Sequence, residues 1–152
     1  MNSDELLPSW SPSDAKSAVL EFVESVTRPG ASYVPPPERI ATFDNDGTLW
    51  VEKPQYVQIS MIVDRWRAMA EADPEKAKRQ PYKAVVENDH AWFANVTEKS
   101  EGLLQGLAEA FEGYTVEAFE QAVREFFATA THPTLGKPYT ELGYQPMREL
   151  LD

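Results

Sequence analysis

Cysteine is absent from the 152-residue sequence, and histidine occurs only twice. The lack of cysteine excludes disulfide bonds, thiolate nucleophiles and cysteine-ligated zinc sites. Two histidines make a histidine-rich metal site a poor hypothesis. No apolar run approaches the roughly 20 residues that a membrane-spanning helix needs. The N-terminal residues are acidic and show no basic stretch before an apolar one, so no signal peptide is indicated. A cytoplasmic protein is therefore expected.

Basic residues are also scarce. Fourteen Lys and Arg stand against 25 Asp and Glu, which gives a net charge of −11. Such a surface repels nucleic acid and anionic membranes, so we expect neither as a partner. An anionic substrate would need a metal ion or local basic groups. Hydrophobic residues make up 42% of the chain, a mixture typical of one globular domain or of a small domain with an insertion.

Helical spacing of apolar residues dominates the chain. A capping-box-like start at Ser11, with Pro12 in the first turn, precedes the first helical segment, and Pro29-Gly30 ends it. Thr115 is suited to cap another helix, and Pro146 fits the first turn of a last one. The glycines and prolines of 131–144 indicate a linker. The expected helical segments cover 15–26, 59–69, 85–96, 103–111 and 119–127.

One short segment, residues 39–43 (Arg-Ile-Ala-Thr-Phe), is typical of a β-strand. It runs directly into Asp44-Asn45-Asp46-Gly47-Thr48. Polar groups thus gather at the carboxyl end of a strand, where α/β sheets bind ligands. A single strand cannot form a sheet, because its backbone groups need neighbours. The sequence therefore indicates either the first part of a longer α/β protein or a chain that borrows strands from a partner.

The apolar strand followed by Asp-x-Asp-Gly-Thr resembles the first motif of the haloacid dehalogenase-like hydrolase superfamily. The resemblance implies an α/β, Rossmann-like core, represented here by its first strand, with a mainly α-helical cap like that of the phosphoserine-phosphatase-like branch. Residues 1–54 would begin the core and carry the nucleophile motif and a flap. Residues 55–135 would form the cap, and residues 136–152 would return to the core.

The same resemblance implies a chemistry. Asp44 would attack phosphorus and form an aspartyl-phosphate, and Asp46 would act as general acid and then base. Gly47 and Thr48 would shape the loop and contact the substrate, and Lys53 would line the mouth of the site. The Asp44 carboxylate and the backbone carbonyl of Asp46, together with a later acidic residue, would hold Mg²⁺. The acidic residue at position 46 favours a phosphomonoester hydrolase over a carbon–halogen hydrolase, with a small phosphorylated metabolite as substrate.

The later motifs of this superfamily are not recognisable in the sequence. The phosphate-binding Ser or Thr, the catalytic Lys and the further acidic metal ligands are missing, and neither Lys53 nor Lys137 stands in the right context to replace them. We therefore expect little or no activity from these residues alone. The alternative is a non-catalytic module that associates with itself, as a homodimer, or with a partner chain that completes the sheet.

Plainer interpretations stand beside these hypotheses. The 44–48 segment could be a hairpin turn, and it matches a calcium loop poorly. Trp50, Trp66 and Trp92 are expected in the core. His90 is expected to be packed and His132 exposed. Lys76, Lys78 and Arg79 are expected on a solvated helix face, or else to attract an anionic substrate to the cap.

Overall fold

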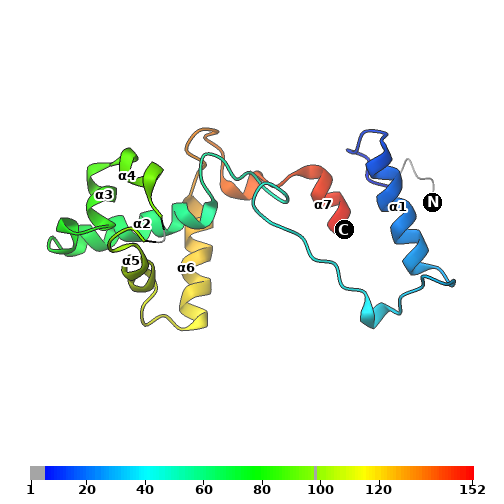
Figure 1. Cartoon of the computed structure of the whole chain (residues 1–152), viewed down its shortest axis with the longest axis horizontal. Helices are drawn as coiled ribbons and strands as arrows, with labels where there is room; N and C mark the ends of the chain where they lie inside the picture. Colours follow the sequence, from blue (N-terminus) through cyan, green and yellow to red (C-terminus); the bar gives the residue numbers. More distant parts are fainter. Residues whose placement is uncertain (1–5, 98) are drawn as a thin grey trace. The chain divides into compact units, whose positions relative to one another are not determined.

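The computed structural model describes residues 6–97 and 99–152 of the chain. Two compact units are present (Figure 1). The first unit comprises residues 1–52 and 142–152, of which 1–5 are outside the described part. The second comprises residues 53–141.

The second unit is built from helices. It contains α2 (Val57–Ala72), α3 (Tyr82–Glu87), α4 (His90–Asn95), α5 (Leu103–Ala110) and α6 (Val116–Thr129). Short 3-10 turns occur at Lys76–Lys78 and Tyr139–Glu141. Thr115 caps α6 as the sequence predicted, because its side chain accepts the backbone N–H of Ala118.

The core of the second unit lies where α2, α3 and α5 meet. Trp66, Tyr82 and Val85 are at most 3% exposed. The Trp66 indole also donates a hydrogen bond of 2.8 Å to the Gly106 carbonyl, which satisfies its polar atom inside the core. The apolar side chains packed around this cluster are Ile62, Val63, Met69, Ala77, Phe93, Leu103, Leu107 and Phe111.

Two glycines let α5 approach this core closely. A Cβ atom at Gly106 would lie 2.5 Å from the Pro81 ring. Gly102 begins α5 at a φ of 74°, and a Cβ there would lie 2.2 Å from the Gln80 carbonyl oxygen. Both positions therefore require glycine, the second also because its backbone is left-handed.

The expected single helix over 85–96 is wrong. The structure has two short helices, α3 and α4, separated at Asn88, which adopts a left-handed conformation with a φ of 52°. Asn tolerates this conformation better than most residues. Asp89 then caps α4 by accepting the backbone N–H of Trp92.

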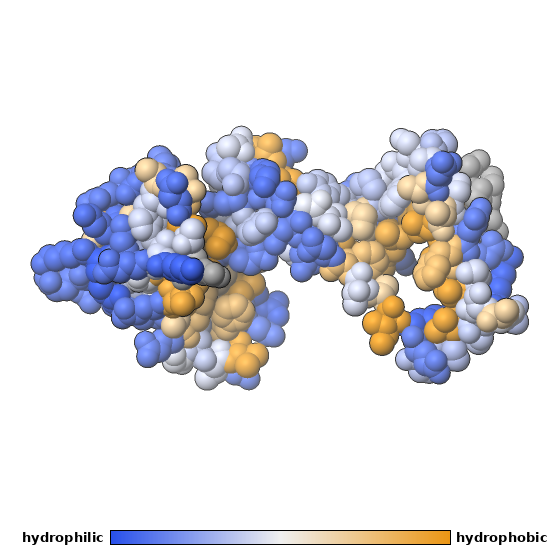
Figure 2. All heavy atoms as spheres, in the orientation of Figure 1, coloured by the Kyte–Doolittle hydropathy of each residue, from blue (hydrophilic) through white to orange (hydrophobic). Residues whose placement is uncertain are grey.

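The first unit contains α1 (Asp14–Thr27), a 3-10 turn at Pro36–Glu38 and α7 (Gln145–Leu151). The cap of α1 is Ser13, which accepts the Lys16 backbone N–H, and not Ser11 as expected. No residue of α1 is buried, and Phe22 is 66% exposed. Figure 2 shows apolar side chains at the surface of this unit.

The α/β fold expected from the sequence is wrong for the described residues. They form helices and isolated β-bridges, and no sheet. Residues 39–43, expected as the first strand of a Rossmann-like core, are extended but unpaired, and Ile40 is 85% exposed. The reason is the one that the sequence raised: no second strand of the described chain lies beside this segment to accept and donate backbone hydrogen bonds.

Candidate functional site

The Asp44–Thr48 motif forms a tight, backbone-bonded turn. The Asn45 carbonyl accepts backbone N–H groups from Thr48, Leu49 and Trp50 at 3.1, 2.7 and 3.3 Å. Gly47 closes the turn by donating its own N–H to the Trp50 carbonyl at 2.8 Å. The loop is therefore fixed without a regular strand before it. The sequence also allowed a hairpin turn at this place. The described residues form only isolated β-bridges here, between Asp46 and Trp50 and between Trp50 and Gly143, and these do not extend into a ladder.

The two aspartates of the motif have different environments. Asp44 is exposed, and its Oδ1 accepts the N–H of Asn45 at 2.9 Å. Asp46 is half-buried, and its Oδ1 accepts the indole N–H of Trp50 at 2.9 Å. The turn thus presents one carboxylate to solvent and orients the other through an aromatic side chain four residues later. The sequence did not predict this role for Trp50.

Glycine at position 47 is required by the turn. Its φ is 75°, a left-handed value that other residues rarely adopt. A Cβ there would also lie 3.0 Å from the carboxyl carbon of Glu52, so Glu52 lies beside the motif. Thr48 is half-buried, and its backbone N–H serves the turn.

The segment that precedes α7 is hydrogen-bonded to the residues that follow the motif turn. Tyr144 donates its backbone N–H to the Leu49 carbonyl at 2.8 Å, and Val51 donates to the buried Leu142 at 3.3 Å. Residues about 90 positions apart in the sequence thus fix each other. Sequence spacing contains no signal for this contact, since both partners are backbone groups.

Lys53, expected at the mouth of the site, belongs to the second unit, whereas Asp44, Asp46, Gly47 and Thr48 belong to the first. Its backbone carbonyl lies 2.5 Å from Nε2 of His132.

The expectation for His132 is wrong. It is 2% exposed, and its Nδ1 accepts the backbone N–H groups of Thr134 and Leu135. Nδ1 is therefore unprotonated, and Nε2 carries the proton that it donates to Lys53. This histidine of the expected linker is buried because its ring accepts the backbone N–H groups of the turn that follows it. His90, by contrast, was expected to be packed and is exposed.

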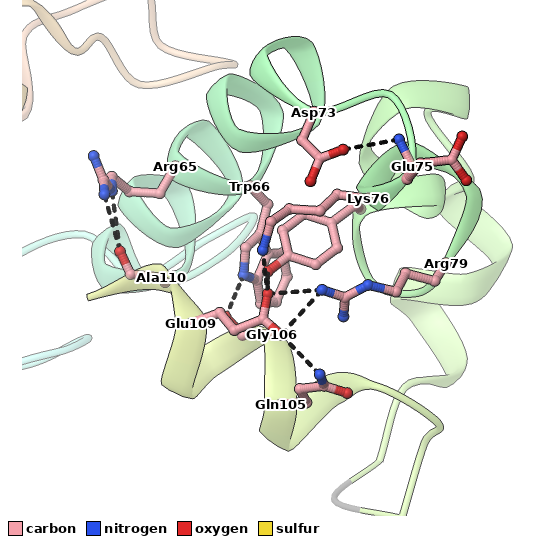
Figure 3. A network of polar contacts seen from close by, with 11 residues as sticks. Arg65, Trp66, Asp73, Glu75, Lys76, Arg79, Gln105, Gly106, Glu109 and Ala110 are labelled. Carbon is pink, nitrogen blue, oxygen red and sulfur yellow. Dashed lines mark hydrogen bonds and ion pairs between the residues drawn. The ribbon is translucent and has the colours of Figure 1, made fainter. Parts of the chain in front are cut away.

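The expectation that Lys76, Lys78 and Arg79 lie on a solvated helix face is also wrong for Lys76 and Arg79. Lys76 and Arg79 both bind the carboxylate of Glu109 from α5, at 2.6 and 2.8 Å, and the Tyr82 hydroxyl donates to it at 2.7 Å (Figure 3). These donors lower the pKa of Glu109 to about 2, with the Arg79 hydrogen bond as the largest cause. Burial and the same carboxylate raise the pKa of Tyr82 to about 12. Two cations, Lys76 and Arg79, share the single Glu109 carboxylate, and Nη1 of Arg79 is buried without a hydrogen-bond partner among the described residues. The cluster is therefore a structural network with a surplus positive charge, which joins the 76–79 segment and α3 to α5.

No preformed metal centre is found among residues 6–97 and 99–152. In this part of the chain, no three His, Asp or Glu side chains are grouped so that they could hold an ion. The donor set of Asp44 and Asp46 alone does not fit a tightly held Mg²⁺. The helices of the described residues are all too short or too polar to cross a membrane.

Comparison with protein-family models gives no match for this sequence, and no curated protein matches it significantly.

Proposed function

We propose that this chain carries the nucleophile loop of a phosphomonoester hydrolase that acts through an aspartyl-phosphate on Asp44, with Asp46 as general acid and base. One observation carries the proposal. The motif loop leaves the Asp44 carboxylate exposed on a turn fixed by three backbone bonds to Asn45, while Trp50 orients Asp46. An exposed nucleophile, and an oriented acid two residues later in the same turn, are the groups that two-step phosphoryl transfer needs.

The reaction would proceed in two displacements. In the first, an Asp44 oxygen attacks phosphorus, the bond between phosphorus and the ester oxygen breaks, and Asp46 gives its proton to the leaving alkoxide. In the second, Asp46 accepts a proton from water, whose oxygen attacks phosphorus. The acyl-phosphate bond then breaks, which restores the Asp44 carboxylate and releases inorganic phosphate.

The resemblance to the superfamily adds Mg²⁺ and a small phosphorylated metabolite to the proposal, in a cytoplasmic protein. Mg²⁺ keeps several waters and is often held by one or two carboxylates together with the substrate's phosphate. Because the described residues offer no cluster of three ligands, we expect metal binding to require the phosphate or a partner. Gly47 and Thr48 would border the substrate.

Hydrolysis of p-nitrophenyl phosphate by the chain, with and without Mg²⁺, tests the proposal. The missing later motifs predict little activity unless a partner chain supplies those groups. Whatever Mg²⁺-dependent turnover the chain shows should fall by about 10³-fold or more in Asp44→Asn, since the nucleophile is lost. Asp14→Asn, an exposed carboxylate of the same unit, is the matched control and should retain activity. Turnover that persists in Asp44→Asn would contradict the assignment.

A second variant separates the two proposed roles. The p-nitrophenolate group leaves without needing a proton, but hydrolysis of the acyl-phosphate needs a base. Asp46→Asn should therefore still release a first equivalent of p-nitrophenol and then accumulate phosphorylated chain, detectable by mass spectrometry. A uniform loss of both steps would assign Asp46 to the structure of the loop instead.

A non-catalytic module is the second candidate function, and the apolar surface of the first unit favours it. Phe22, Val23 and Ile40 are 66%, 46% and 85% exposed. Exposed apolar groups of this kind promote association with another chain or a second copy. Absence of any Mg²⁺-dependent turnover, together with a dimer in light scattering, would favour this candidate. A monomer at all concentrations would count against it.

A further inference from the structure

A cavity of about 380 Å³ opens in the second unit between α2, α6 and the segment that follows α6. This volume lies at the lower end of the range for small-molecule pockets. Three kinds of side chain line it. The polar ones are Gln55, Ser60, Thr129 and Thr131, the aromatic ones are Phe126 and Tyr139, and the carboxylate is that of Asp64.

The polar lining is ordered by its own hydrogen bonds. Gln55 donates its amide N–H to Ser60 Oγ at 2.8 Å, and Ser60 Oγ lies 2.9 Å from the hydroxyl of Tyr139. Each hydroxyl keeps further donor or acceptor capacity, because one hydroxyl offers one donor and two acceptor positions. Groups of this kind recognise hydroxyls of a ligand.

The aromatic lining is a stacked pair. The rings of Phe126 and Tyr139 are 6.0 Å apart at an angle of 28°. Tyr139 is 8% exposed and is fixed from the other side by His132, whose ring lies 5.6 Å away. The cavity thus combines a rigid aromatic wall with hydroxyl groups.

The carboxylate of Asp64 differs from the paired carboxylate of Glu109 in the same unit. Glu109 accepts hydrogen bonds from four side chains, those of Lys76, Arg79, Tyr82 and Gln105. By contrast, no hydrogen bond or ion pair engages Asp64 within the described chain. Asp64 is an exposed residue, but neighbouring side chains displace part of the water around its carboxylate. This desolvation raises its pKa, and Arg67 offsets the effect only in part. A cationic ligand would supply the missing compensation.

The residues around the cavity also favour a cationic ligand. Among the described residues, no Lys or Arg lines this cavity. An adjoining hollow of about 320 Å³ shares Asp64, Phe126 and Thr129 and adds Glu125. Arg65 also borders that hollow, but its guanidinium donates to the Ala110 carbonyl at 3.1 and 3.2 Å and lies over the Tyr114 ring.

We propose that this cavity binds a small hydroxylated organic amine. The ammonium group would pair with Asp64, the hydroxyl groups would bond to Ser60 and Thr129, and the apolar face would lie on Phe126 and Tyr139. A carboxylate beside an aromatic face is a favourable environment for an ammonium ion. The inference concerns the second unit alone and is independent of chemistry at Asp44.

Titration of the full chain with glucosamine, followed by amide NMR shifts and calorimetry, tests the proposal. Glucose has the same ring without the ammonium group, and cyclohexylamine has the ammonium group without the hydroxyls. Glucosamine should bind in the millimolar range and shift the amides of Ser60, Asp64 and Thr129. Either comparison compound should bind about tenfold more weakly, because each lacks one set of polar contacts.

Variants assign the preference to particular groups. Asp64→Asn should remove the preference for glucosamine over glucose. Glu71→Gln neutralises an exposed acid on the same helix away from the cavity and should leave that preference unchanged. Tyr139→Phe should reduce the preference for glucosamine over cyclohexylamine while keeping the ring stack. Equal binding of glucose and glucosamine, a preference that survives Asp64→Asn, or shifts confined to other residues would overturn the proposal.

Discussion

The two units of this chain are stabilised in different ways. In the second, Trp66, Tyr82 and Val85 are nearly inaccessible to solvent, and a carboxylate network joins α3 to α5. In the first, Leu7 and Leu142 are the buried hydrophobic residues of the described part, and α1 buries none. The candidate nucleophile therefore lies in the unit with the smaller core, on a loop held by backbone hydrogen bonds. A turn can therefore be held by backbone hydrogen bonds, within itself and to the segment before α7, without a packed sheet beneath it.

The largest expected difference comes from removing one large side chain from each unit. Trp66→Ala should destabilise the second unit by about 3–5 kcal/mol, because it leaves a cavity and removes the hydrogen bond to Gly106. Phe22→Ala should change the stability of the chain by less than about 0.5 kcal/mol, since its ring is mostly exposed. Urea unfolding followed by circular dichroism measures both. Equal effects would show that α1 has a packing partner in solution.

A smaller difference is expected from adding one methyl group at a glycine. Gly106→Ala places a Cβ 2.5 Å from the Pro81 ring and should cost about 1–3 kcal/mol. Gly30→Ala, in the first unit, meets no atom closer than 4.0 Å and should be close to neutral. Thermal unfolding of the two variants side by side distinguishes them. A neutral Gly106→Ala would mean that α5 does not pack as closely as described.

The smallest expected effect concerns the Glu109 network and its dependence on pH. The folded pKa of Glu109, about 2, is below the unfolded value of 4.5, so its contribution is present above pH 4.5 and is lost as the pH falls toward 2. Glu109→Gln should cost about 1–2 kcal/mol at neutral pH and little at pH 2. Chemical unfolding across this range measures the change. Glu112→Gln, an exposed neighbour, is the control, and a pH profile unchanged by Glu109→Gln would contradict the account.

Local signals in the sequence predicted part of this structure. The cap at Thr115, the burial of Trp66 and the helical character of 55–135 follow from hydrogen-bonding chemistry and apolar spacing, and the structure confirms them. The break at Asn88 was missed, because the apolar spacing continues across it while the backbone does not.

Other features depend on contacts between distant residues. The strand at 39–43 was expected from its β-rich composition, but pairing decides whether a strand forms, and no described segment pairs with it. Lys76 and Arg79 look solvated in sequence because Glu109, some 30 positions later, is invisible to local patterns. The motif at Asp44–Thr48 indicated the candidate site, but neither the orientation of Asp46 by Trp50 nor the contact with Tyr144 could be predicted.

Amide hydrogen exchange along the whole chain tests the central contrast most directly. We expect amides of α3 and α5 to exchange only on global unfolding of the second unit, and those of α1 and residues 39–43 to exchange rapidly through local opening. The hydrogen-bonded amides of Thr48 to Trp50 should fall between these extremes. Equal, strong protection of α1 and α5 would contradict the account, because it would require a core in the first unit comparable to that around Trp66.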